Sequence, residues 1–108
     1  MTEPIPASAV VRVSRGTFDP SRFAEVEGAN KEISEYLIPA IKRLTGLIHY
    51  YTGVSPDGSI VHISVWESDE DATQMSRLKE IIVDAREEFE ARGVAFIPIV
   101  NYPIHWTI

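Results

Sequence analysis

The sequence contains no cysteine, no long apolar run and no excess of basic residues. Without cysteine there are no disulfides, thiolate metal sites or cysteine nucleophiles, so any chemistry must come from other groups. No apolar stretch approaches the roughly 20 residues that cross a bilayer, so we expect no membrane span. Sixteen acidic residues against 10 basic ones give a net charge of −6. That is the wrong sign for neutralising phosphates, so we expect no nucleic-acid partner.

Glycine-rich phosphate loops, nucleophile elbows and internal repeats are missing as well. The first eight residues have neither the basic start nor the hydrophobic segment of a signal peptide, so we expect a disordered lead at 1–8 and a cytoplasmic protein. The 44% apolar fraction is typical of a globular protein, and 108 residues suit one core. We place one domain at 9–100 and a tail at 101–108 that packs on the domain or on a partner subunit.

The first half of the chain predicts a strand followed by a helix. Residues 9–15 are rich in β-branched side chains and precede a glycine, which is typical of a strand. Asp19 is then a candidate N-cap and Pro20 a candidate first helical residue. Apolar residues recur every three or four positions from there until Gly46, where a helix C-cap is expected. Pro39 lies inside this pattern, so we expect a kink or break there.

The second half predicts a hairpin and a second helix. Two β-branched runs, 47–53 and 60–66, flank the turn sequence Ser-Pro-Asp-Gly. Ser68 is the candidate N-cap of a helix at 69–92, whose acidic first turn suits the positive end of the helix dipole. Its apolar residues also step by three and four. A last strand is expected at 94–100.

The resulting order, β-α-β-β-α-β, indicates an α+β, ferredoxin-like fold in which two helices cover one face of a four-stranded antiparallel sheet. The strand at 60–66 carries apolar side chains on both parities, with Val61, Ile63 and Val65 on one side and Ile60, His62, Ser64 and Trp66 on the other. The strand at 94–100 is also apolar on both parities. Two buried faces with helices for only one imply a second copy of the sheet, so we predict a homodimer joined face to face.

His62 is the candidate catalytic residue. An imidazole with a pKa near 6.5 suits proton transfer at neutral pH. We predict a general base that takes a proton from a phenol, enol or anthrone-like carbon acid, leaving an anion able to reduce O2. The alternative is a structural histidine, hydrogen-bonded beneath a helix or filling the interface.

Four further residues are candidate substrate contacts. Trp66 offers a flat wall for an aromatic ligand, and Ser64 can orient a ligand oxygen, although both also suit simple packing. Arg12 and Ser14 form the polar parity of the first strand. If they share the cleft face they hold an acidic substrate group, whereas an arginine snorkelling from a sheet edge is the alternative.

The face of His49 depends on the hairpin loop. A two-residue loop at Pro56 and Asp57 would put His49 on the face of His62, whereas a three-residue loop ending at Gly58 would put it on the opposite face. The Pro-Asp-Gly order favours the three-residue loop. The third histidine, His105 in the tail, has no short spacing to the other two, so we expect no metal site.

One local motif suggests a family. "VWES" followed by "DEDA", after "GLIHYY" and within this order of elements, resembles the antibiotic-biosynthesis-monooxygenase domain of the dimeric α/β-barrel superfamily. The resemblance implies a homodimeric barrel of two facing sheets with the helices outside. It also implies a small-molecule cleft in each protomer, between the sheet and the helices.

The resemblance also implies site residues. In the cofactor-free, quinol-forming oxygenases of this family, a tryptophan of the third strand and a polar residue four positions earlier line the cleft. The matching positions here are Trp66 and His62, with histidine where the oxygenase pattern has asparagine. Ala72 stands where those oxygenases have a tyrosine. We therefore expect a small-molecule-binding protein that acts, without a cofactor, as a monooxygenase on an aromatic or polyketide-like substrate.

Two alternatives remain open at this point. One is a non-catalytic ligand-binding or interaction module, which a cleft plugged by Tyr36, Met75 or Leu78 would favour. The other is a haem-degrading monooxygenase. In that branch of the family a histidine of the second helix binds haem, and residues 69–92 contain no histidine.

Overall fold

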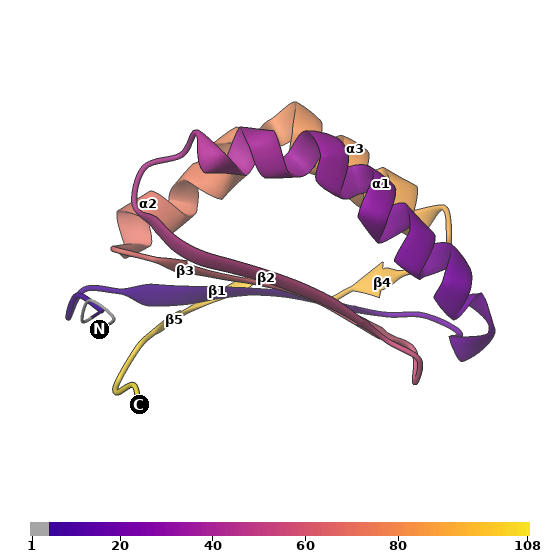
Figure 1. The fold of residues 1–108 in the computed structure, drawn as a ribbon, viewed down its shortest axis with the longest axis horizontal. Helices are drawn as coiled ribbons and strands as arrows, with labels where there is room; N and C mark the ends of the chain where they lie inside the picture. The colour runs from indigo at the N-terminus through magenta and orange to yellow at the C-terminus, as the bar shows by residue number, and fades with distance from the viewer. Residues whose placement is uncertain (1–4) are drawn as a thin grey trace.

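A computed structural model describes residues 5–108, apart from the side chains of residues 79–81. The first four residues of the expected lead lie outside this range. Figure 1 shows two layers, with helices arching over one face of an antiparallel sheet. The elements are β1 (Val10–Thr17), η1 (Pro20–Arg22), α1 (Phe23–Lys42), β2 (Leu47–Ser55), β3 (Ser59–Trp66), α2 (Asp69–Thr73), η2 (Gln74–Arg77), α3 (Lys79–Glu90), β4 (Ala95–Phe96) and β5 (Val100–Pro103).

The sheet order is β2-β3-β1-β4, with β5 also paired to β1, so β1 and β3 occupy its interior. Every pairing is antiparallel. This confirms the ferredoxin-like α+β fold with helices on one face. No helix in the described part of the chain combines the length and apolar character needed to cross a membrane.

The first helix begins as expected and then differs from the prediction. Asp19 accepts a hydrogen bond from the Ser21 backbone N–H, and Pro20 opens the short 3-10 turn η1 that leads into α1. The helix then continues through Pro39 to its end, so the expected break does not occur. Leu37 and Ile41, on either side of the proline, are buried against the sheet. Their burial holds both sides of the last turns in place although one backbone hydrogen bond is lost.

The hairpin loop has three residues. Ser55 pairs with Ser59, so residues 56–58 form the loop, and its glycine has a φ of 103°. Counting along β2 from this pairing puts His49 on the face opposite His62. The three-residue loop predicted from the Pro-Asp-Gly sequence is therefore confirmed.

The second helix is divided where the sequence predicts one continuous element. Ser68 is the N-cap, because its hydroxyl accepts the Asp71 N–H at 3.1 Å. One turn later the Gln74 amide donates to the carbonyls of Asp71 at 2.8 Å and Thr45 at 2.6 Å. The Asp71 carbonyl also accepts the Gln74 backbone N–H. The helix tightens here into the 3-10 turn η2 before α3 begins, because this side chain competes for the helical acceptor.

The last strand is also divided. Instead of one strand at 94–100, the short strands β4 and β5 both lie beside β1, which makes five strands where we expected four. Pro98 lies between them, and a proline has no N–H to continue the ladder. Residues 101–103, which we placed in the tail, extend β5 and pair with β1.

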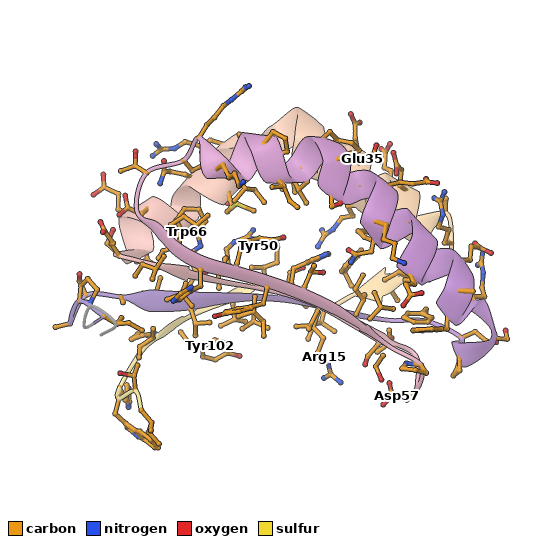
Figure 2. The ribbon with its side chains drawn as sticks, in the orientation of Figure 1. Arg15, Glu35, Tyr50, Asp57, Trp66 and Tyr102 are labelled. Atoms are coloured by element: carbon orange, nitrogen blue, oxygen red, sulfur yellow. The ribbon has the colours of Figure 1, made fainter. Side chains whose placement is uncertain are left out.

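The core lies between the sheet and the helices. Its largest fully buried side chains are Trp66, Phe89, Ile33, Ile60, Met75 and Val26. Figure 2 shows Trp66 and Tyr50 on the helix side of the sheet, and Arg15 and Tyr102 on the other side. Within residues 5–108, no helix lies over that other face (Figure 1).

Candidate functional site

A cavity of about 190 Å³ lies between the sheet and the helices. Its polar residues on the sheet come from three strands: Arg12 and Ser14 from β1, Tyr50 from β2 and His62 from β3. Its remaining lining residues, mostly apolar, are Leu37, Met75, Ser76, Ile82, Ala85, Arg86, Phe89, Phe96 and Ile99. Polar groups on the floor beneath apolar walls are the usual arrangement of a small-molecule site.

Strand register explains why these polar groups meet. On the face towards the helices, Thr52, His62 and Ser14 form one row across β2, β3 and β1. The next row contains Tyr50, Ser64, Arg12 and Asn101. Cross-strand neighbours lie about 5 Å apart, so the cavity opens over two adjacent rows of polar side chains.

His62 is held in a defined orientation. Its Nε2 lies 3.0 Å from the Asn30 side-chain oxygen of α1, and the Asn30 amide also hydrogen-bonds to the Thr52 hydroxyl at 3.2 Å. An amide oxygen can only accept, so Nε2 carries the proton and Nδ1 keeps its lone pair. The ring lies between Tyr50 and Phe89, with centroid distances of 6.2 and 5.7 Å.

Burial sets the protonation states of His62 and Tyr50. It lowers the pKa of His62 to about 4, and the positive charge of Arg12 acts in the same direction. Burial also raises the pKa of Tyr50 to about 12, although Arg12 opposes this change. Near neutral pH the site therefore presents a neutral imidazole with one acceptor nitrogen and a phenol that can donate.

Arg12 faces the cavity from the middle of the sheet. It is only 9% exposed, and β1 lies between β3 and the pair formed by β4 and β5. The alternative of an arginine snorkelling from a sheet edge is therefore wrong. Arg86 approaches from α3, where its guanidinium carbon lies 5.1 Å from the centre of the Phe96 ring.

No protein-family sequence model matches this chain, and no curated protein sequence does. Several solved structures match over nearly its whole length. SnoaB, a cofactor-independent oxygenase from Streptomyces nogalater, matches in a mutant form with 18% identity and a TM-score of 0.67, covering 94% of this chain and 98% of that one. A monooxygenase from the gene ActVA-Orf6 of Streptomyces coelicolor, in complex with nanaomycin D, matches with 18% identity and a TM-score of 0.66, covering 94% and 92%.

A Deinococcus radiodurans protein provisionally assigned to the antibiotic biosynthesis monooxygenases matches with 14% identity and a TM-score of 0.68, covering 92% and 95%. The chain has the antibiotic biosynthesis monooxygenase fold. The family resemblance seen in the sequence is thus confirmed for the fold. One fold hosts many activities, so the function has to be inferred from the site itself.

Of the five site residues predicted from the sequence, three line the cavity and two do not. Arg12, Ser14 and His62 line the cavity, whereas Ser64 and Trp66 do not. Instead the Trp66 indole N–H donates to the Ser64 hydroxyl at 2.8 Å, and both side chains are buried. Trp66 lies four residues from His62, about 13 Å along an extended strand. Contact of Trp66 and Ser64 with a ligand stays a prediction.

The polar lining or supporting residues that were not predicted from the sequence include Tyr50, Arg86 and Asn30. Tyr50 shares the helix-facing parity of β2, but that parity is known only once the hairpin register is known. Arg86 lies between two cavity residues of α3, and Asn30 follows buried Val26 by four residues on α1. Helical spacing was the available signal for both, because residues four apart share a face.

The other histidines lie elsewhere. His49 is exposed on the opposite face of the sheet, and His105 is exposed in the tail. Among the residues that the structure describes, no group of three His, Cys, Asp or Glu side chains is arranged to hold a metal ion.

Proposed function

We propose that this protein is a homodimeric, small-molecule-binding α/β barrel that oxygenates an aromatic or polyketide-like carbon acid without a cofactor. The observation that carries the proposal is the cavity with His62 on its floor, where a neutral imidazole held by Asn30 through Nε2 lies among largely apolar walls. The likeness in fold to two named oxygenases supports it.

His62 is the base of the proposed reaction. Its low pKa reflects the cost of bringing a lone positive charge into a buried site. Proton transfer from a bound carbon acid has a different balance, because it creates the imidazolium and the substrate anion together. Their attraction in a poorly solvated cavity offsets much of that cost. Asn30 positions the ring by holding the Nε2 proton, so that Nδ1 receives the substrate proton.

The oxygen chemistry then needs no further reagent than O2. The C–H electron pair stays on the substrate as a carbanion, which transfers one electron to O2, and the two radicals join in a C–O bond. The peroxide oxygen takes the proton from His62. His62, again neutral, takes the second proton from the same carbon as the O–O bond breaks, and the hydroxide that leaves receives this proton. A CH2 group thus becomes C=O, while the other oxygen atom leaves as water.

The experiment is O2 uptake with a panel of anthrones and quinols. Wild type should consume one O2 for each anthrone, and His62→Ala should be slower by roughly 100- to 10,000-fold, the usual contribution of general base catalysis. His105→Ala, at an exposed histidine of the tail, is the matched control and should retain the wild-type rate. Equal rates for wild type and His62→Ala, or no uptake by either, would remove the proposed role of His62.

The homodimer rests on the uncovered face of the sheet. Its side chains are predominantly apolar: Val11, Val13, Tyr51, Val61, Ile63, Val65, Val100 and Tyr102. Tyr51, Val100 and Tyr102 are 57, 43 and 50% exposed in the single chain. A face of this kind is self-complementary about a two-fold axis, so a second copy suits it.

Solution mass tests the dimer. Wild type should have twice the 12.1 kDa mass of one chain, and Ile63→Asp should have the mass of a monomer because it buries an unpaired charge in the interface. Val83→Asp, on an exposed face of α3, should remain a dimer. A wild-type protein of single-chain mass at all concentrations would contradict the proposal.

A non-catalytic ligand-binding module is the other class of function. Of the three side chains expected to plug its cleft, Met75 lines the cavity, whereas Leu78 and Tyr36 are not among the lining residues. The Tyr36 hydroxyl lies 3.5 Å from the Glu88 carboxylate. The open volume favours a small-molecule site over an interaction module. Ligand binding without O2 uptake across the whole panel is the result that would support this alternative.

A further inference from the structure

The cavity has the opposite charge to the rest of the protein. The whole chain has a net charge of −6, yet two of its 10 basic residues, Arg12 and Arg86, line the cavity. No aspartate or glutamate is among the lining residues in the described part of the chain. A small, partly enclosed space with two cations and no anion has a strongly positive local potential.

Arg12 is the unusual member of this pair. It is nearly buried, and none of the described carboxylates forms an ion pair with it. The groups that interact electrostatically with Arg12 are Tyr50 and Arg86, which also line the cavity. An isolated buried charge costs several kcal/mol unless it gains a partner. Arg12 therefore carries a charge without an ion-pair partner at a position that lines the cavity.

The other polar groups around Arg12 also suit an acceptor ligand. Tyr50 presents a protonated phenol and Ser14 a hydroxyl, both of which can donate. Arg86 is held at the cavity by its stacking on Phe96. The apolar walls, which include Phe89 and Ile82, suit an apolar part of the ligand and offer no polar contacts to a fully polar anion such as phosphate.

We propose that the cavity selects aromatic carboxylates, with the ligand carboxylate paired to Arg12 inside the cavity and approached by Arg86 from the α3 side. The Arg12 charge is present before any reaction. It therefore favours a ligand group that is already negative over one that becomes negative only during the reaction. A volume of about 190 Å³ lies below the roughly 300 Å³ of the smallest drug-sized pockets and favours a compact ring system. This inference rests on the proposed small-molecule site and specifies its substrate class.

Binding to matched ligand pairs tests the inference. The dissociation constants of 2-naphthoate, methyl 2-naphthoate and inorganic phosphate are measured by calorimetry with wild-type dimer, without O2. The acid should bind about 10- to 100-fold more tightly than its ester, as expected for a charge-assisted contact. Phosphate should bind more weakly than the acid because it lacks a ring.

Substitutions of three arginines test which of them contacts the ligand carboxylate. Arg12→Gln should weaken 2-naphthoate binding by about 10-fold or more and leave binding of the ester unchanged. Arg86→Gln, at an exposed position, should weaken the acid by a smaller factor and provides a second test if Arg12→Gln does not fold. Arg43→Gln, exposed after the end of α1, is the control and should bind the acid like wild type.

Three results would overturn the inference: acid and ester of equal affinity, no binding of the acid at millimolar concentrations, or phosphate as tight as the acid. Its failure can be told apart from failure of the proposed oxygenase. Acid-selective binding with no O2 uptake leaves the inference standing and refutes the oxygenase. Oxygenation that depends on His62 with no preference for acids does the reverse.

Discussion

His62 makes the stability of this protein depend on pH, and one substitution should remove that dependence. An imidazole in the unfolded chain titrates near 6.5, whereas burial in the folded protein lowers the pKa to about 4. Between these two pH values the unfolded state binds more protons than the folded state. The contribution of neutral His62 to stability is therefore complete above pH 6.5, is lost progressively as the pH falls from 6.5, and is gone below about 4.

The size of the effect follows from the two pKa values. The difference between 6.5 and about 4, at about 1.4 kcal/mol for each pKa unit, amounts to roughly 3 kcal/mol in total. About 2 kcal/mol of this should already be lost at pH 5, because the unfolded imidazole is then almost fully protonated. Carboxylates also titrate in this range, but they are common to wild type and variant and cancel in the comparison.

The assay is urea unfolding of wild type and His62→Gln, each at about pH 7 and about pH 5 and at one protein concentration. Glutamine can still donate a hydrogen bond to Asn30 but does not titrate. Between the two pH values wild type should lose about 2 kcal/mol more than the variant. His105→Gln controls for the loss of an exposed histidine. If His62→Gln and wild type change in parallel to within about 0.5 kcal/mol, His62 is not the buried neutral imidazole described here.

Two further predictions concern stability. Ser64→Ala removes the acceptor of the buried indole N–H and should lower the free energy of unfolding by about 1–3 kcal/mol; Ser76→Ala, an exposed serine, should change it by less than about 0.5 kcal/mol, and equal effects in the two variants would contradict the reasoning. Gly58→Ala places a Cβ at a φ of 103° and against the Phe18 carbonyl oxygen, so thermal unfolding should show a loss of about 1–3 kcal/mol. Gly28→Ala, in α1, adds its Cβ to open space and should not destabilise the protein in the same scan.

Much of the fold could be predicted from local patterns. Alternation of side chains along residues 60–66 predicts which of them face the helices, because a strand has a period of two whatever its partners are. The turn sequence ending at Gly58 predicts the hairpin loop, and Ser68 predicts the start of α2, because both depend on hydrogen bonds within a few residues. These features are local, and the structure agrees with them.

The differences arise where distant groups decide the local structure. The second helix is divided because Gln74 hydrogen-bonds to Thr45, which lies 29 residues earlier in the chain. Pro98 divides the last strand, although the apolar pattern continues across it. For α1 the opposite holds, since burial on both sides of Pro39 keeps a helix that the local rule would break.

The candidate site shows the same limit. Strand parity puts His62, Ser64 and Trp66 on one face, but parity cannot say how far along the strand the cavity extends. That depends on how the helices pack above it, and here the Trp66 side chain is fully buried and hydrogen-bonded to Ser64. Arg12 could be assigned to the cavity only after the strand order showed that β1 is interior.

The strand β3 separates two kinds of evolutionary constraint by a single residue. Substitutions at His62 alter the chemistry of the cavity, whereas substitutions at its neighbours Val61 and Ile63 alter the uncovered face of the sheet. Because adjacent side chains point in opposite directions, one set can change while the other is conserved. In the dimer that we propose, a lineage with this strand can therefore acquire a new ligand without a new interface, and a new interface without a new ligand.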